Sequence, residues 1–498
     1  MKPASNELYE LIHALTEKEK SRFRKYCLFK ADSDSSNYLK IFDAYEKQKQ
    51  ADEAKVKATC KIENFSRVKN YLQHQLLSFI EENENNSIHK EISNQIAIAD
   101  ALFNRSLYKH SLSVLIKARQ KASDYQMFPY LLTIEELITR NYLSLGNLET
   151  YIKENWVNTM HSLTDQVKNE AEMSEYVYRL RIFWYKQNTL MRSQENVEEL
   201  ATIVLPMIER GEDFPQSHRS KISFHINAGY YYKQVFRFDE AIYHFKKCVD
   251  LYEGNEVIKN SQLLSYILAL NNLMFVYSGV KSFPEIRALI DKLELVEVKS
   301  KRLKILKFQV WGLFVADYYR HVIDTDRKIK LKQIETEFPE YADLLQLQSH
   351  IAIVNCISVN YFIEGDFKKA LEWVNKLDDM QNNALYRGIL SIIKIYTLII
   401  HYELGKSDYL DYAITNTYRY LLNHKQFYKF EKLAISTLRQ ILAADSLKKQ
   451  KEILSVVYSE LLVLQNDPHE REVFSIFNFA GWIRCRLNNE SYLNLMNG

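Results

Sequence analysis

The residue types that most often carry out chemistry lack the spacing that catalysis or metal binding requires. The adjacent carboxylates Asp378–Asp379 and Glu135–Glu136 would diverge by about 100° on a helix, so neither pair makes a good catalytic dyad. The 13 histidines are scattered, and neither His110 nor His225 has metal-ligand spacing; both are expected on the surface or between helices. Phosphate-binding glycine loops, HExxH and GxSxG are absent. We therefore expect no enzyme, cofactor or metal, with a site assembled from distant segments as a minor alternative.

Aromatic residues are the next candidates, because 34 tyrosines and 25 phenylalanines could stack on nucleic-acid bases. The densest stretch is GYYYKQVFRFDEAIYHF, from Gly229 to Phe245. Aromatic residues recur, however, at matching positions in several segments with helical periodicity. That recurrence is more typical of packing between helices, so we interpret most of these rings as core.

The composition favours a helical protein. Glycine and proline, the strongest helix breakers, number only 11 and 7 in 498 residues, which makes a turn-rich all-β fold improbable. Lys+Arg 66 and Asp+Glu 63 nearly balance, which disfavours binding of nucleic acid by the whole molecule. Five scattered cysteines suggest reduced thiols, and no segment resembles a signal peptide or a membrane span. We expect a cytoplasmic protein without membrane insertion, and the abundance of Lys, Asn, Ile and Tyr suggests a bacterial source.

The sequence predicts three segments: an N-terminal helical module (1–82), a helical repeat array (88–445) and C-terminal capping helices (446–498). Polar breaks at Lys30–Asn37 and Glu81–Ser87 interrupt the first part of the chain, and the second break sets the first boundary. Within the module, Thr16 followed by Glu19 forms a capping box, which predicts a helix from about residue 17.

The array repeats a pattern in which one helix ends at an aromatic-rich turn and another begins. One position near the start of each second helix often carries a small residue. The residues at this position are Ser111, Tyr151, Ala241, Ile286, Ala370 and Ala413. The intervals between these positions are about 40–45 residues or twice that, which is the signature of a solenoid of stacked helix pairs.

The stretch Ile222–Asn255 resembles a tetratricopeptide repeat. It carries the glycine, aromatic, alanine and phenylalanine of that family's pattern at Gly229, Tyr232, Ala241 and Phe245. It lacks the family's Trp, Leu and Pro at His225, Ala228 and Glu253. The resemblance implies an all-α, right-handed superhelix of stacked antiparallel helix pairs. The long period leaves HEAT-like repeats as the alternative fold.

In tetratricopeptide proteins the first helices line a concave groove, where asparagines bind a peptide backbone. The resemblance therefore implies such a role for asparagines at equivalent or adjacent register positions, which are Asn227, Asn271, Asn272 and Asn355. An amide group can satisfy the donor and the acceptor of a peptide group together. Tyr230 and Lys233 are the other candidates for contact with a partner. The alternative is that these asparagines are merely solvated or cap helices.

The N-terminal module has two competing interpretations. The pattern of Asp52–Ile80 predicts two helices around a turn, with Arg67 and Lys69 exposed on the second helix. This arrangement would suit a helix-turn-helix domain that binds DNA. A cap that covers the apolar end of a solenoid is the other interpretation. The modest charge and the absence of glycine at the turn favour the cap.

These features together predict a non-enzymatic scaffold or adaptor that binds a protein or peptide partner. The alternative is a peptide- or ligand-responsive transcription regulator that binds nucleic acid through residues 1–82.

Overall fold

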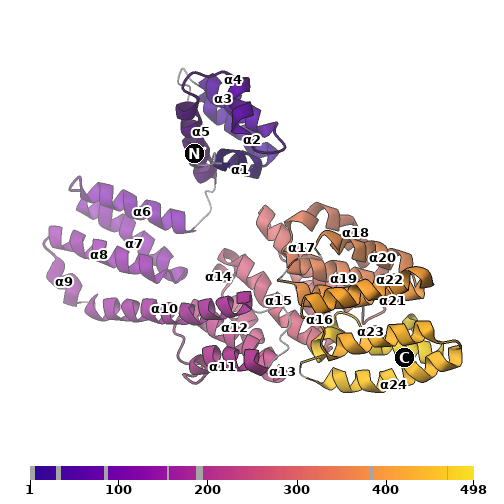
Figure 1. The fold of residues 1–498 in the computed structure, drawn as a ribbon. Helices are drawn as coiled ribbons and strands as arrows, with labels where there is room; N and C mark the ends of the chain where they lie inside the picture. The colour runs from indigo at the N-terminus through magenta and orange to yellow at the C-terminus, as the bar shows by residue number, and fades with distance from the viewer. Residues whose placement is uncertain are drawn as a thin grey trace. The chain divides into compact units, whose positions relative to one another are not determined.

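The computed structural model describes residues 6–29, 35–83, 88–153, 156–186, 194–380, 383, 385–467 and 469–497 (Figure 1). Every regular element among these residues is a helix, which confirms the predicted all-α class. None of the described helices is long and apolar enough to span a bilayer. The polar breaks predicted at Lys30–Asn37 and Glu81–Ser87 lie partly outside the described residues.

The helices follow one another along the chain with short connections. The first nine are α1 (Glu7–Ala14), α2 (Glu17–Phe29), α3 (Ser35–Glu46), α4 (Glu53–Cys60), α5 (Phe65–Asn83), α6 (Ile88–Phe103), α7 (Tyr108–Asp124), α8 (Phe128–Ser144) and α9 (Leu148–Lys153). The next nine are α10 (Trp156–Lys186), α11 (Gln194–Ile208), α12 (His218–Gln234), α13 (Phe238–Glu253), α14 (Glu256–Ser261), α15 (Leu263–Gly279), α16 (Phe283–Glu294), α17 (Lys301–Tyr318) and α18 (Arg327–Tyr341). The last eight are α19 (Leu347–Ile363), α20 (Phe367–Val374), α21 (Arg387–Glu403), α22 (Ser407–Asn423), α23 (Lys429–Ala443), α24 (Leu447–Asn466), α25 (Phe479–Asn488) and α26 (Tyr492–Asn497). Three short 3₁₀ helices are η1 (Ala342–Leu344), η2 (Asn375–Met380) and η3 (Arg471–Ser475).

The chain forms two compact units, one of residues 1–121 with 134–148 and the other of residues 122–133 with 149–498. The segment boundaries predicted from the sequence stay predictions. In the second unit, one continuous cluster of buried apolar side chains extends from Ile222 on α12 to Tyr492 on α26.

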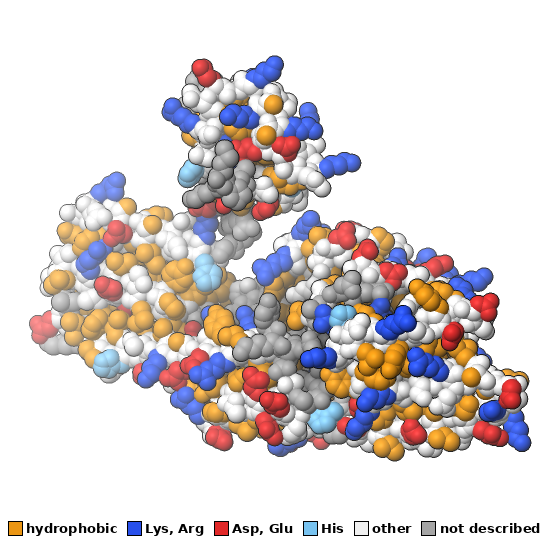
Figure 2. All heavy atoms as spheres, viewed as in Figure 1, with side chains coloured by type: hydrophobic (Ala, Val, Ile, Leu, Met, Phe, Trp, Pro, Cys, Tyr) orange, Lys and Arg blue, Asp and Glu red, His pale blue; other side chains and the backbone are white. Residues whose placement is uncertain are grey.

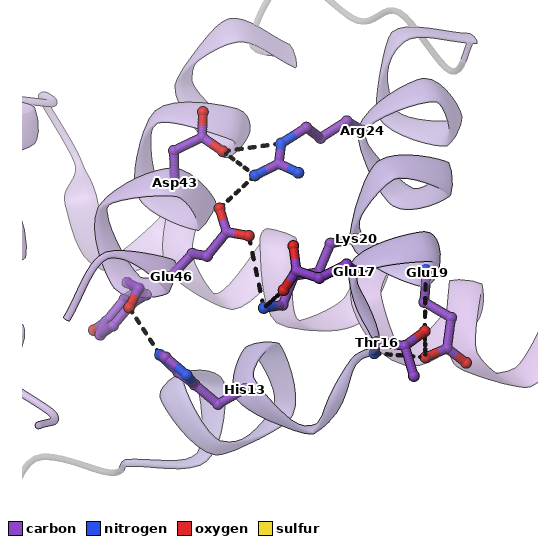
Figure 3. A network of polar contacts seen from close by, with 9 residues as sticks. His13, Thr16, Glu17, Glu19, Lys20, Arg24, Asp43 and Glu46 are labelled. Atoms are coloured by element: carbon purple, nitrogen blue, oxygen red, sulfur yellow. Dashed lines mark hydrogen bonds and ion pairs between the residues drawn. The ribbon is translucent and has the colours of Figure 1, made fainter. Parts of the chain in front are cut away.

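In the first unit, the start of α2 is fixed by the predicted capping box (Figure 3). The Thr16 backbone N–H donates to Glu19 Oε2 at 2.8 Å, and the Glu19 N–H donates to Thr16 Oγ1 at 3.3 Å. Two amides that the first helical turn would otherwise leave unpaired are thereby satisfied, which confirms the prediction.

A network of charged side chains then joins α2 to α3 (Figure 3). Arg24 on α2 donates to Asp43 Oδ1 at 3.0 Å and also pairs with Glu46, both on α3. Lys20, one turn earlier, lies 3.7 Å from the other Glu46 oxygen. The network sits beside the apolar contact of Phe23 with Phe42, so charge pairing and packing fix the same two helices.

Helix connections in both units share one turn geometry. Between α12 and α13, the Arg237 N–H donates to the Tyr232 carbonyl at 2.9 Å, and Phe236 has a φ of 62°. The same bond around a residue of positive φ recurs at Ser106, Gln126, Gly146, Lys281, Gly365, Gly405 and Lys425. This is a Schellman-type ending, which satisfies a terminal carbonyl and reverses the chain within a few residues.

Consecutive helices in the second unit pack in pairs, and the α12–α13 pair makes a close contact at Gly229. Ala241 is fully buried. A Cβ atom added to Gly229 would lie 2.8 Å from the Phe245 ring, so the missing side chain admits that ring between the helices. Phe245 therefore packs in the core, as we interpreted most of these rings from the sequence.

Replacing Ala241 by Phe should overpack this contact and lower the free energy of unfolding by about 1–3 kcal/mol. Lys246→Phe, on an exposed position of the same helix, is the control and should change it by less than about 0.5 kcal/mol. Thermal and denaturant unfolding measure both. Equal stability of the two variants would contradict the packing register.

Replacing Thr16 by Ala should destabilise the first turn of α2 by about 1 kcal/mol, because the Glu19 amide loses its acceptor. Hydrogen exchange at Glu19 should accelerate. Thr59→Ala is the control, since the Thr59 hydroxyl donates only to the Lys55 carbonyl within α4. Unchanged Glu19 exchange in Thr16→Ala would show that the capping box does not stabilise this helix.

Candidate peptide-binding face

The first helices α15, α17 and α19 belong to three successive pairs of the second unit (Figure 1) and pack one against the next. Tyr230 on α12 reaches α15, where its hydroxyl donates to Asn272 Oδ1 at 2.9 Å. These four helices present the face on which the sequence predicted a partner to bind, and we call it the first-helix face.

Four of the six predicted residues lie together on α12 and α15. Asn271 Nδ2 donates to Asn272 Oδ1 at 3.3 Å, and the same oxygen accepts from Tyr230. The Lys233 ammonium lies 4.2 Å from the centre of the Phe275 ring. Phe275 is 47% exposed, so this cluster combines an apolar surface with a cation and amide groups.

Burial sets the protonation of this cluster. It raises the pKa of Tyr230 to about 12, so the hydroxyl stays a neutral donor at physiological pH. Burial lowers the pKa of Lys233, and the carboxylate of Glu472 opposes that shift. Lys233 therefore has both an aromatic and an acidic neighbour within its own chain.

The other two predicted residues lie apart from the cluster. Asn227 is only 2% exposed, and its amide nitrogen contacts Met207 Sδ at 3.8 Å. Asn355 on α19 is also buried, and its Nδ2 donates to the Ile476 carbonyl at 2.9 Å. The roles of both asparagines in partner binding stay predictions.

The bond from Asn355 is part of a larger contact in which the chain binds its own backbone. Arg320, two residues after α17, donates through Nη1 to the Ile476 carbonyl at 3.1 Å and through Nη2 to the Ser475 carbonyl at 3.0 Å. We call residues 471–477 the C-terminal segment. Two side chains from adjacent helix pairs thus converge on one carbonyl oxygen of this segment.

A buried carboxylate supports the guanidinium of Arg320. Asp317 on α17 pairs with Arg320 and accepts from the Ser278 hydroxyl on α15 at 2.5 Å. Burial alone would raise the pKa of Asp317, but the charges of Arg320 and His321 and the Ser278 hydroxyl outweigh it and hold that pKa below its ordinary value. The ion pair links two first helices, α15 and α17, to the C-terminal segment.

Aromatic contacts fix both ends of the C-terminal segment. The Phe477 ring lies 5.0 Å from Phe362 on α19 and 4.6 Å from Tyr396 on α21. At the other end, the Arg471 guanidinium lies over the rings of Phe236 and Phe238, between α12 and α13. The segment therefore makes contacts from the α12–α13 pair to the α21–α22 pair.

Three polar atoms along this contact have no hydrogen-bond partner among the described residues. They are the Asn355 Oδ1 acceptor and two donors, Arg320 Nε and Arg471 Nη2, and all three atoms are buried. Buried polar groups are nearly always paired in folded proteins, so unpaired ones are notable. Here they leave one acceptor and two donors along the path of a bound backbone.

Sequence reasoning missed Arg320, Asp317 and the C-terminal segment. Residues 446–498 were predicted to be capping helices, and α24 does pair with α23. The run VFSIFNFAGW, from Val473 to Trp482, was the available signal, because it is too apolar for an exposed terminus. Nothing local in the sequence links that run to Arg320, which lies 156 residues before Ile476.

Sequence reasoning also missed a contact between two histidines. His225 on α12 lies between helices, as predicted, with its Nδ1 2.9 Å from Nδ1 of His244 on α13. Burial lowers the pKa of His225 to about 4 and also lowers that of His244, so both rings are neutral at physiological pH. The 19 residues between them match no familiar metal-binding motif.

The first unit contains the predicted two helices around a turn, α4 and α5. Arg67 is exposed on α5, but the prediction of an exposed Lys69 is wrong, because its ammonium pairs with Glu53 at 2.6 Å and is largely buried. On the face of α1–α5 visible in Figure 2, basic and acidic side chains are interspersed. This arrangement gives no support to DNA binding.

No protein-family model matches the chain, no curated protein has significant sequence similarity to it, and no solved structure matches it significantly. The similarity to tetratricopeptide repeats therefore stays a resemblance. Function must be inferred from the contacts that the chain makes.

Replacing Arg320 by Met should lower the free energy of unfolding by about 3–5 kcal/mol, because Asp317 would remain buried without its partner. Asp317→Asn should also destabilise. The double variant Asp317→Asn/Arg320→Met should lose clearly less than the sum of the two, since neither charge remains. Denaturant unfolding of the three variants measures the coupling, and additive losses would contradict the role of the ion pair.

Proposed function

We propose that this protein is a non-enzymatic scaffold or adaptor that binds a protein or peptide partner on its first-helix face. The observation that carries the proposal is the capture of the chain's own backbone by side chains of that face. Asn355 and Arg320 both donate to the Ile476 carbonyl, and Arg320 also donates to the Ser475 carbonyl. Hydrogen bonds to backbone carbonyls bind a main chain without requiring particular side chains. Peptide-binding proteins use hydrogen bonds of this kind.

The same proposal includes a tetratricopeptide-like right-handed superhelix, with HEAT-like repeats as the alternative. Sequential helix pairs, the recurring Schellman-type turn and the close contact at Gly229 support it. Stacked pairs of this kind present their first helices side by side, which gives an extended surface for many modest contacts.

The cluster on α12 and α15 is the part of the face that we assign to a partner. Phe275 is exposed there, and Leu268, seven residues earlier on the same side of α15, is exposed as well. Lys233 supplies a cation beside them, and Asn271 supplies an amide. The fitting partner is an extended segment with an apolar side chain for Phe275 and a carboxylate for Lys233.

Selection of displayed peptides on the full chain tests this function. We expect enrichment of peptides that combine an acidic and an apolar residue. Their dissociation constants should rise at least about thirtyfold in the double variant Lys233→Ala/Asn271→Ala, because one charge-assisted and one neutral hydrogen bond are lost. Fluorescence anisotropy measures the affinities.

Lys247→Ala is the matched control, because Lys247 is an exposed lysine on α13, a second helix. It should leave the affinity unchanged. Failure to enrich any peptide, or binding that weakens only in Lys247→Ala, would contradict the proposed function.

A further inference from the structure

Two buried imidazoles and one carboxylate converge where α12 meets α13. His225 and His244 are each 6% exposed, and their Nδ1 atoms are 2.9 Å apart. Glu212, in the connection before α12, contributes a carboxylate oxygen from the surface. One donor atom from each residue lies within 4.8 Å of the other two, so three separate parts of the chain supply this cluster.

Neighbouring rings orient the two histidines, and a hydroxyl orients the carboxylate. The Tyr232 ring stacks on His244 with a centroid distance of 5.4 Å and an interplanar angle of 7°. The Tyr243 hydroxyl donates to Glu212 Oε2 at 3.0 Å. Metal ligands typically have such outer partners, which fix the direction of each donor atom.

The spacing suits a small divalent ion. Zinc bonds to nitrogen at about 2.0–2.1 Å, so tetrahedral ligands lie about 3.3 Å apart. The two imidazole nitrogens would separate by only a few tenths of an ångström. The Glu212 oxygen lies within 4.8 Å of the histidine donor atoms, so it would approach each by at most about 1.5 Å, and its exposed side chain has the freedom to do so.

We propose that Glu212, His225 and His244 bind one divalent transition-metal ion of the zinc type, with water in the fourth position. Two imidazoles and a carboxylate are a common zinc ligand set with three protein donors. In the metal-free pair, one Nδ1 must carry the shared proton. On binding, that proton moves to Nε2 of the same ring, so both Nδ1 lone pairs face the ion and no net proton is released.

The bound ion would fasten the connection before α12 to both helices of the pair. Tyr230 and Lys233 of the proposed peptide-binding cluster lie on the same helix as His225. The ion would therefore stabilise the helix that presents them, and zinc should raise the melting temperature of the protein. This assignment does not depend on the proposed peptide binding.

Zinc chloride added to the tag-free full chain tests the site. We expect about one tightly bound equivalent, measured by competition with a chromophoric chelator, and a rise in melting temperature that EDTA reverses. His244→Asn should abolish stoichiometric binding. Glu212→Gln should weaken the affinity at least about tenfold, and its exposed position makes this variant safe for folding.

His110→Asn, which changes an exposed histidine on α7, is the control and should bind zinc as the parent chain does. Zinc K-edge spectra of the loaded protein should report two imidazole nitrogens and oxygen ligands. The proposal is overturned if the parent chain binds no zinc, or if Glu212→Gln and His244→Asn bind it as tightly as His110→Asn.

Discussion

The buried ion pair of Arg320 and Asp317 is the interaction on which the second unit most depends. A charge in the interior is costly unless an opposite charge and hydrogen bonds compensate for its lost hydration. Here Ser278, Asp317 and Arg320 form a chain from α15 past α17, and it ends on the carbonyls of Ser475 and Ile476. Because each of these side chains bonds to the next group in the chain, the network fixes α15, α17 and the C-terminal segment relative to one another.

Features governed by local physics could be predicted from the sequence. The capping box at Thr16 and Glu19 and the core packing of Phe245 each depend on residues a few positions or one helix pair apart. The Schellman-type turns overrode local preference at Phe236 and Lys281, which adopt a positive φ without being glycine. Packing of the helix pairs evidently outweighs that conformational cost.

Features governed by distant contacts could not be predicted. The repeat register placed Asn227 on the binding face, but it cannot reveal that Met207 of α11 lies against that side chain. It placed Asn355 correctly on a first helix, but it could not identify Ile476 as the group that its amide binds. The approach of His244 to His225 likewise depends on how two helices are rotated, which spacing along the chain does not encode.

The first-helix face thus has two parts. Arg320 and Asn355 bind the backbone of the C-terminal segment, and in our proposal Lys233, Asn271 and Phe275 bind a partner. The most direct measurement is site-specific photocrosslinking of the selected peptides to the full chain. A photoreactive phenylalanine analogue would replace either Phe275 on α15 or Tyr412 on α22, two aromatic residues that are 47% and 66% exposed. Crosslinking at Phe275 and its absence at Tyr412 is the predicted result, and crosslinking at Tyr412 alone would contradict partner binding by the first-helix face.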